Sequence, residues 1–116
     1  MQFVLHALDS VDSTQTEAQR LAAEGAPEGA VVTAHHQRAG RGQRGHEWWD
    51  DPGESLLVSV LLRPPSSPSE APQLSLVAGL AVAEALATAG LTAHIRWPND
   101  LLVGERKVCG LLPEAR

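Results

Sequence analysis

The chain has 116 residues, of which 43% are hydrophobic, and it carries 14 acidic against 9 basic side chains, a formal net charge of −5. This length predicts one domain at most, with room for a hydrophobic core, and the acidic balance argues against general binding to nucleic acids or membranes. Because the sequence has one cysteine, no signal peptide and no apolar run that could span a bilayer, we expect a cytoplasmic protein without an internal disulfide.

The first third of the chain predicts two strands with a helix between them. Residues 1–8 form the first expected strand. A helix then begins near Thr14, which has capping-box spacing with Glu17, and ends at Gly25. Residues 30–34 predict a short β-branched strand that leads directly into a segment rich in glycine and arginine.

The middle of the chain predicts one strand and one long helix. Residues 55–62 are nearly all apolar, which is typical of a strand buried on both faces. Residues 64–72 hold four of the eight prolines and predict a surface loop. The strongest helical pattern covers residues 73–89 and stops at Gly90, with an apolar stripe that would pack closely on a sheet and consists of Leu74, Val77, Ala78, Ala81 and Ala85.

The last part of the chain predicts one more strand and a hairpin. Residues 94–96 begin the strand, and residues 101–103 and 107–112 flank a turn at residues 104–105. This order of elements predicts an α/β (α+β) fold, in which a mixed β-sheet carries helices on one face. The strand at 108–112 would have no later element to cover its edge, so we expect that the chain is truncated or pairs with a partner.

The most informative segment is residues 35–46, HHQRAGRGQRGH, which contains three arginines, three glycines, three histidines and no acid. Glycines let a backbone approach a ligand closely and arginines pair with anions, so the segment predicts an anion site. A solvated surface loop that is basic by chance is the alternative. Its glycines also spell GxGxxG, but the dinucleotide-binding fingerprint requires a helix directly after them, and residues 48–53 predict a turn.

Four segments in chain order carry a more specific pattern, namely DSTQ at 12–15, QRAGRGQRGHEW at 37–48, RWPNDL at 96–101 and KVCGLL at 107–112. They closely resemble the biotin protein ligases, also called biotin–[acetyl-CoA-carboxylase] ligases. That family has a DST helix start, an AGRGRxGRxW loop, a KWPND loop and a strand with a K-x-x-G pattern. The resemblance spans about residues 9 to 114, and it implies a fold of the class II aminoacyl-tRNA synthetase and biotin synthetase type.

The resemblance also implies a chemistry, in which ATP activates biotin as biotinyl-5′-AMP and biotin is then transferred to a lysine of a carboxylase carrier protein. Arg41 and Lys107 would be the catalytic cations, because adenylation depends on positive charge and positioning. Biotin would contact Ser13, Thr14, Gln37, Gly40, Arg41, Gly42, Gln43, Lys107 and Gly110. The nucleotide and its phosphates would contact Arg44, Trp48, Asn99 and Asp100, and Asp100 would also hold Mg²⁺.

Several of these assignments have a purely structural alternative. Ser13 and Thr14 could serve only as helix caps, Trp48 as a core side chain, and Lys107 as a solvated surface lysine. Residues 99–100 could stabilise a turn through their own backbone. The histidines of the loop lack metal-ligand spacing with the cysteine, and we propose no zinc site.

The sequence departs from the family pattern at several positions. Gln43 and His46 stand where the family has arginines, so the loop loses positive charge. Arg96 replaces the lysine before Trp97, which keeps the charge but changes the geometry. No helix-turn-helix and no C-terminal β domain are recognisable. We therefore expect residues 1–116 to be the N-terminal portion of a biotin/lipoate ligase-like catalytic domain, weakly active or inactive alone.

Three other functions stay open from the residues alone. They are a non-catalytic binder of biotin or an adenylate, a lipoate or octanoate transferase of the same fold, and an RNA-binding module that uses the loop with Trp48 and Trp49. The expected partners are biotin, ATP with Mg²⁺ as co-substrate, and the biotin carboxyl carrier protein of acetyl-CoA carboxylase. We expect no bound prosthetic group, no nucleic acid and no membrane, with a homodimer as one option for the assembly.

Overall fold

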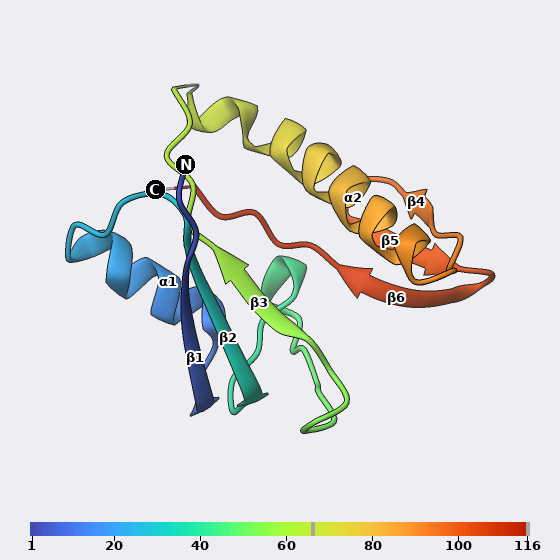
Figure 1. Cartoon of the computed structure of the whole chain (residues 1–116), viewed down its shortest axis with the longest axis horizontal. Coiled ribbons are helices and arrows are strands. Elements are labelled where there is room, and N and C mark those ends of the chain that lie inside the picture. The colour runs from blue at the N-terminus through green and yellow to red at the C-terminus, as the bar shows by residue number, and fades with distance from the viewer. Residues whose placement is uncertain (66, 116) are drawn as a thin grey trace. The chain divides into compact units, whose positions relative to one another are not determined.

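The computed structural model describes residues 1–65 and 67–115 (Figure 1). The chain divides into two compact units, Met1–Pro64 and Pro65–Arg116, and each is described by itself. The first unit contains β1 (Val4–Val11), α1 (Thr14–Ala23), β2 (Ala30–Gln37), η1 (Gln43–Gly45) and β3 (Leu57–Val60). The second contains η2 (Pro68–Glu70), α2 (Ala71–Thr88), β4 (His94–Arg96), β5 (Asp100–Val103) and β6 (Arg106–Gly110).

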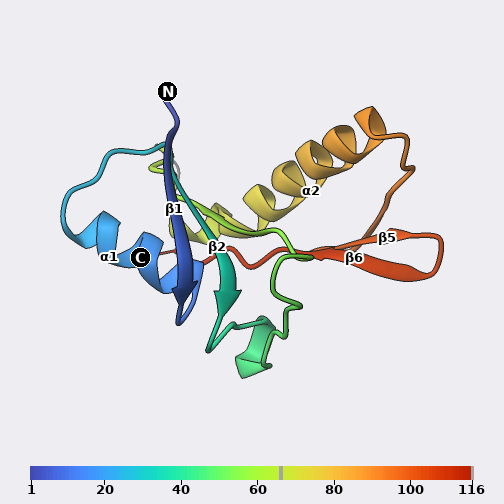
Figure 2. The ribbon, with the colours of Figure 1, turned by 60° about the horizontal axis from the view of Figure 1, so that its bottom comes forward.

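The first unit is a three-stranded mixed sheet with β2 at its centre. β2 pairs in parallel with β1 and antiparallel with β3. Side chains alternate across a strand, and Ala30, Val32 and Ala34 of β2 are the buried set. The helix α1 packs against β2 and β3 and covers one face of this sheet (Figure 2).

The strands of this unit differ from the predicted ones in length and burial. β1 starts and ends three residues later than predicted, and β2 continues to Gln37, three residues beyond its predicted end. The prediction that β3 is buried on both faces was wrong: Leu57 and Ser59 are buried, whereas Val58 and Val60 are 40% and 46% exposed. An apolar run alone does not show whether one or two layers cover a strand.

The helix α1 begins and ends where its sequence signals place it, and one of the two residues predicted as caps is its N-cap. Ser13 is the N-cap, and its Oγ accepts the Thr16 N–H at 2.9 Å. The predicted capping box was wrong, because Glu17 forms an ion pair with Arg20. At the other end Gly25 takes the left-handed conformation (φ +91°) that commonly ends a helix.

The second unit places α2 against an antiparallel sheet of order β4-β5-β6. The hairpin of β5 and β6 is confirmed, with β6 ending at Gly110. α2 begins at Ala71, two residues earlier than predicted, so the proline-rich loop is shorter than expected. Residue 66 of that loop lies outside the described residues.

The prediction of which side of α2 is buried was wrong. Val77, Ala81 and Ala85 are exposed, while Ser75 and Gly79 are buried. A Cβ atom built at Gly79 would lie 3.5 Å from Leu111 Cδ1, so small residues mark the side that packs most closely. Close packing on a sheet was therefore predicted correctly, but the face that makes the contact was not.

The predicted α/β class is confirmed, and the strands of residues 1–65 and 67–115 form two sheets of three. Among the described residues, no helix is both long and apolar enough to cross a membrane.

Candidate functional site

A buried polar network lies at the start of α1 in the first unit. The Thr14 N–H donates to Gln37 Oε1 at 2.8 Å, and Thr14 Oγ1 lies 2.8 Å from Ser59 Oγ. Ser59 in turn donates to Gln15 Oε1 at 2.7 Å. Ser13, Thr14 and Ser59 are almost fully buried, at 2%, 3% and 6% exposure. The end of β2, the start of α1 and β3 are thus held together by hydrogen bonds between side chains that can also bind a polar ligand.

Arg41 extends from the loop onto the start of the same helix. Its Nη1 donates to Ser13 Oγ at 3.0 Å and to Thr16 Oγ1 at 2.7 Å. The N-terminus of a helix carries partial positive charge, and the guanidinium adds a full charge beside it. This place on the molecule therefore favours a negatively charged group, as the sequence predicted for the loop.

Main-chain hydrogen bonds close the loop from Gly40 to Trp48. Trp48 N–H donates to Gly40 O at 2.9 Å, and Gly42 N–H donates to His46 O at 2.7 Å. A Cβ atom at Gly40 would lie 2.7 Å from both Gln37 Nε2 and Trp48 O, so a side chain does not fit there. The glycine lets Gln37 and the returning loop approach each other.

The tip of the loop is exposed to solvent. Gln43 and Arg44 form its outer turn, and Arg44 has a left-handed backbone (φ 58°). Gln43 and Arg44, predicted ligand contacts, are thus exposed to solvent, whereas Ser13 and Thr14 are buried.

A hollow of about 330 Å³ lies between the two stems of the loop. Its size is at the lower end of the range for small-molecule sites. Trp49 at its rim is 83% exposed, whereas Trp48 is half-buried. Three predicted site residues, Gln37, Gly40 and Trp48, line this hollow. The full lining consists of His36, Gln37, Arg38, Ala39, Gly40, Glu47, Trp48, Trp49 and Asp50.

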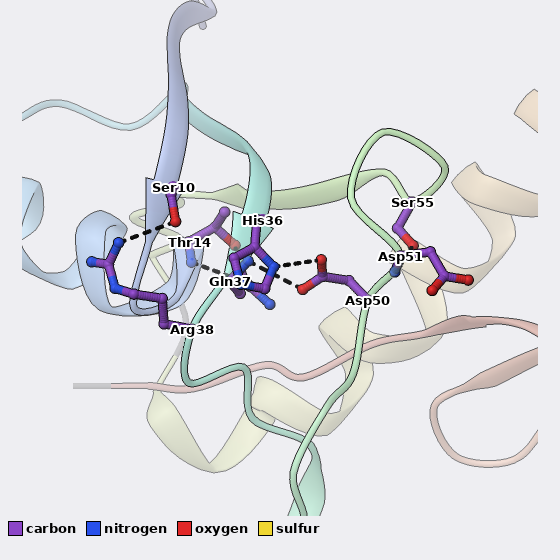
Figure 3. A network of polar contacts seen from close by, with 8 residues as sticks. All are labelled: Ser10, Thr14, His36, Gln37, Arg38, Asp50, Asp51 and Ser55. Atoms are coloured by element: carbon purple, nitrogen blue, oxygen red, sulfur yellow. Dashed lines mark hydrogen bonds and ion pairs between the residues drawn. The ribbon is translucent and has the colours of Figure 1, made fainter.

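Asp50 is a buried charge that sequence reasoning assigned only to a turn. Its side chain is 0% exposed, and its two oxygens meet His36 Nδ1 at 2.9 Å and the Gln37 N–H at 3.1 Å (Figure 3). Burial raises the pKa of Asp50, but the hydrogen bonds from His36 and from the Gln37 N–H outweigh that effect and hold it below its ordinary value. An ionised Asp50 only accepts, so His36 Nδ1 is the donor.

In the second unit Asp100, a predicted phosphate contact, forms an ion-pair cluster with Lys107 and Arg96. Asp100 Oδ1 lies 2.9 Å from Lys107 Nζ, and Asp100 Oδ2 lies 2.8 Å from Arg96 Nη2. Burial raises the pKa of Asp100, but the bonds from Arg96 and Lys107 outweigh it and hold that pKa below its ordinary value. Gly110 is the strand partner of Asp100 across the hairpin.

Asn99, beside this cluster, has a structural contact of its own. Its side chain is buried, and Nδ2 donates to Leu111 O at 2.8 Å while Leu111 N–H donates back to Asn99 O at 2.9 Å. This reciprocal pair fixes the chain that leaves β6. One N–H of the side-chain amide is therefore engaged within the fold, and contact with a nucleotide stays a prediction for Asn99.

Residues 7–116 match the model of the "Biotin/lipoate A/B protein ligase family". The chain belongs to this family. It is 44% identical over 111 residues to the biotin–[acetyl-CoA-carboxylase] ligase of Paracoccus denitrificans, a match of 93% of this chain and 45% of the relative. It is 41% identical over 107 residues to the bifunctional ligase/repressor BirA of Bacillus spizizenii, covering 91% of this chain and 33% of BirA.

Solved biotin protein ligases share its fold. The enzyme of Aquifex aeolicus in complex with biotin and ATP matches with a TM-score of 0.83 and 38% identity, over 96% of this chain and 46% of that chain. The Helicobacter pylori enzyme with bound biotinylated ATP matches with a TM-score of 0.79 and 30% identity, over 97% and 55%. The resemblance predicted from the motifs is confirmed, and the chain spans about a third to a half of the length of these relatives.

For this biotin/lipoate ligase family member, the predicted site residues fall into two groups. The first unit brings Ser13, Thr14 and Gln37 together with Gly40 and Arg41 at the start of α1. The second unit joins Asp100 with Lys107 and Gly110 on its hairpin. The sequence missed Ser59, Gln15, His36 and Asp50, because each acquires its role through contacts between distant segments.

A magnesium ion at Asp100 was implied by the resemblance, and the side chains there do not offer it a ready site. Both carboxylate oxygens contact cationic partners. In the part of the chain that the structure describes, no group of three or more His, Cys, Asp or Glu could hold a metal ion. The Mg²⁺ role of Asp100 stays a prediction, and we derive no step through a resident metal.

Proposed function

We propose that this chain acts as a biotin protein ligase, activating biotin with MgATP as biotinyl-5′-AMP and transferring biotin to a lysine of a carboxylase carrier protein. The observation that carries the proposal is the pairing of Thr14 with Gln37 directly beside Arg41 at the buried start of α1. Biotin has a neutral ureido ring at one end and a carboxylate at the other. A site for it needs both hydrogen-bonding groups and a cation, and the first unit offers both.

The chemistry follows from charge. The biotin carboxylate attacks the α-phosphorus of ATP and displaces pyrophosphate, which gives the mixed anhydride. The carrier lysine then attacks the acyl carbon and releases AMP. Negative charge is concentrated where the carboxylate meets the phosphate, and Arg41 with the N-terminus of α1 would offset it. The family resemblance also implies a catalytic role for Lys107, and within the second unit its ammonium lies 2.9 Å from Asp100 Oδ1.

The polar network also supports biotin over lipoate, the other substrate class in the family's description. Thr14, Gln37, Ser59 and Gln15 form a continuous set of hydrogen-bonding groups in an otherwise buried setting. The ring of biotin can exchange hydrogen bonds with such groups, whereas the dithiolane of lipoate cannot. A site that hydrogen-bonds its ligand discriminates strongly against an analogue that lacks the matching polar groups.

Calorimetry on the chain with biotin, lipoate and octanoate tests this proposal. We expect biotin to bind most tightly, and Arg41→Ala to weaken it by about tenfold or more, as for loss of a charged hydrogen-bond partner. Arg20→Ala is the matched control, because Arg20 is an exposed arginine of the same unit that pairs with Glu17 and Glu24. Absence of biotin binding, or equal loss in both variants, would count against the proposal.

Release of pyrophosphate from MgATP in the presence of biotin tests the catalytic step separately. Dependence of that release on biotin and on Arg41 supports a ligase. Tight biotin binding without pyrophosphate release would instead favour a non-catalytic binder.

A further inference from the structure

We propose that Asp50 is a positioning residue of this site, which ties the returning stem of the loop to Gln37 and so holds Gln37 against Thr14. The identity of the ligand rests on the proposed function, whereas the contacts of Asp50 are present without a ligand. Asp50 lies beyond Trp48, where the loop motif ends, and its carboxylate is bonded to the His36 ring and to the main-chain N–H of Gln37.

Strand geometry explains why a carboxylate is placed there. Successive N–H groups along a strand point to opposite sides. Arg38 N–H donates to Val11 O of β1, so the Gln37 N–H points away from β1. On that side β3 pairs with β2 only up to Ala34, and the acceptor that a longer β3 would offer is missing. Asp50 Oδ1 takes this place at 3.1 Å and satisfies the Gln37 N–H.

The second carboxylate oxygen of Asp50 also has a hydrogen-bond partner. A fully buried carboxylate needs compensation for the loss of water, and His36 Nδ1 at 2.9 Å supplies it together with the Gln37 N–H. The hydrogen bonds hold the pKa of Asp50 below its ordinary value despite burial, so the group is ionised at neutral pH. A simple turn needs no buried carboxylate held by two donors in this way.

Gln37 transmits the effect to the proposed biotin site. Its main chain is fixed by Asp50, while its side-chain Oε1 accepts the Thr14 N–H at 2.8 Å (Figure 3). Its Nε2 lies against Gly40, where no side chain fits. Release of the Asp50 anchor frees the last residue of β2 and the base of the loop together, so both loop order and ligand affinity should fall.

The test compares Asp50→Ala with Asp50→Asn and with Asp51→Ala. Asn keeps an oxygen for the Gln37 N–H, and its NH₂ group can donate to His36 Nδ1 when the imidazole carries its proton on Nε2, whereas Ala keeps neither partner. Asp51→Ala removes the same charge one residue away, where only the main chain is hydrogen-bonded to Ser55 Oγ. Thermal unfolding of each variant is recorded first.

Two readouts separate the anchor from the proposed function. Without ligand, limited trypsin cleavage after Arg41 and Arg44 reports loop order, and calorimetry reports biotin affinity. We expect Asp50→Ala to raise the cleavage rate and weaken biotin binding by about tenfold each, as when a buried donor loses its partner. The cleavage rate and the biotin affinity of Asp50→Asn should stay within about threefold of the parent values. Those of Asp51→Ala should equal the parent values.

Equal cleavage and equal affinity for the Ala variants of Asp50 and Asp51 would overturn the inference. If the parent chain binds no biotin, the proposed function fails, and the cleavage comparison alone decides whether Asp50 anchors the loop. Should Asp50→Ala not fold, His36→Ala replaces it, because this half-exposed side chain holds the same carboxylate from the other side. Unchanged cleavage in His36→Ala and Asp50→Asn would then refute the anchor.

Discussion

Substitution of Gly40 by alanine is the sharpest perturbation that the loop offers. The new Cβ would lie 2.7 Å from Gln37 Nε2 and 2.7 Å from Trp48 O. The amide of Gln37 can rotate away only by giving up its place beside Thr14, since its Oε1 accepts the Thr14 N–H. The carbonyl of Trp48 belongs to the backbone and moves only if the loop opens.

The expected loss of stability follows from these two contacts. Overpacking at a site that cannot relax costs about 1–3 kcal/mol. Opening the loop would also weaken the 2.9 Å hydrogen bond from Trp48 N–H to Gly40 O, which contributes about 1 kcal/mol. We therefore expect Gly40→Ala to destabilise the first unit by about 2–4 kcal/mol and to weaken biotin binding.

Gly42→Ala is the matched control, two residues along the same loop. Its backbone is extended (φ −107°), and a Cβ there would lie 3.5 Å from His46 O, an ordinary contact. This change should alter stability by no more than about 0.5 kcal/mol. Urea unfolding followed by tryptophan fluorescence measures both variants. Equal unfolding midpoints for the two would refute the close-approach role of Gly40.

Three further predictions concern the cap, the buried carboxylate and the hairpin. Ser13→Ala should lower stability by about 1 kcal/mol in thermal unfolding through loss of the N-cap, whereas Ser10→Ala should change it little. Because the folded-state pKa of Asp50 lies below its ordinary value of 3.8, its contribution is present above that value and is lost as pH falls through the folded pKa. Urea midpoints should therefore drop on acidification less steeply in Asp50→Asn than in the parent chain. Asn99→Ala should destabilise the second unit by about 1–2 kcal/mol, measured against Glu105→Ala in the exposed turn.

Local signals in the sequence were enough for much of the fold. Gly25 and Gly90 end their helices with positive φ values, and the turn at Gly104 joins the predicted hairpin. Each of these features depends on backbone conformations that few residues adopt, so the residue type alone marks the position. The motif of the loop likewise identified the family without any knowledge of packing.

Packing explains what sequence reasoning could not predict. The apolar residues of α2 cover more than one side of the helix, so the side that meets the sheet at Gly79 was not distinguishable from the side with Val77. β3 has the composition of a buried strand but one packed face. Asp50 could be placed in a turn from its neighbours, but its contact with Gln37 joins two segments 13 residues apart and leaves no local trace.

The three arginines of the loop have different surroundings, and this bears on the departures from the family motif. Arg38 is exposed and pairs with Asp12 at 3.0 Å, Arg44 lies at the exposed tip, and Arg41 alone reaches the buried start of α1. Positive charge in this loop is therefore not interchangeable between positions. Gln43 and His46, where the family has arginines, are both exposed, so these changes leave the contacts of Arg41 with Ser13 and Thr16 in place. The loss of charge falls on the outer turn of the loop, where screening by solvent is strongest, and the proposed binding function depends on the inner contact.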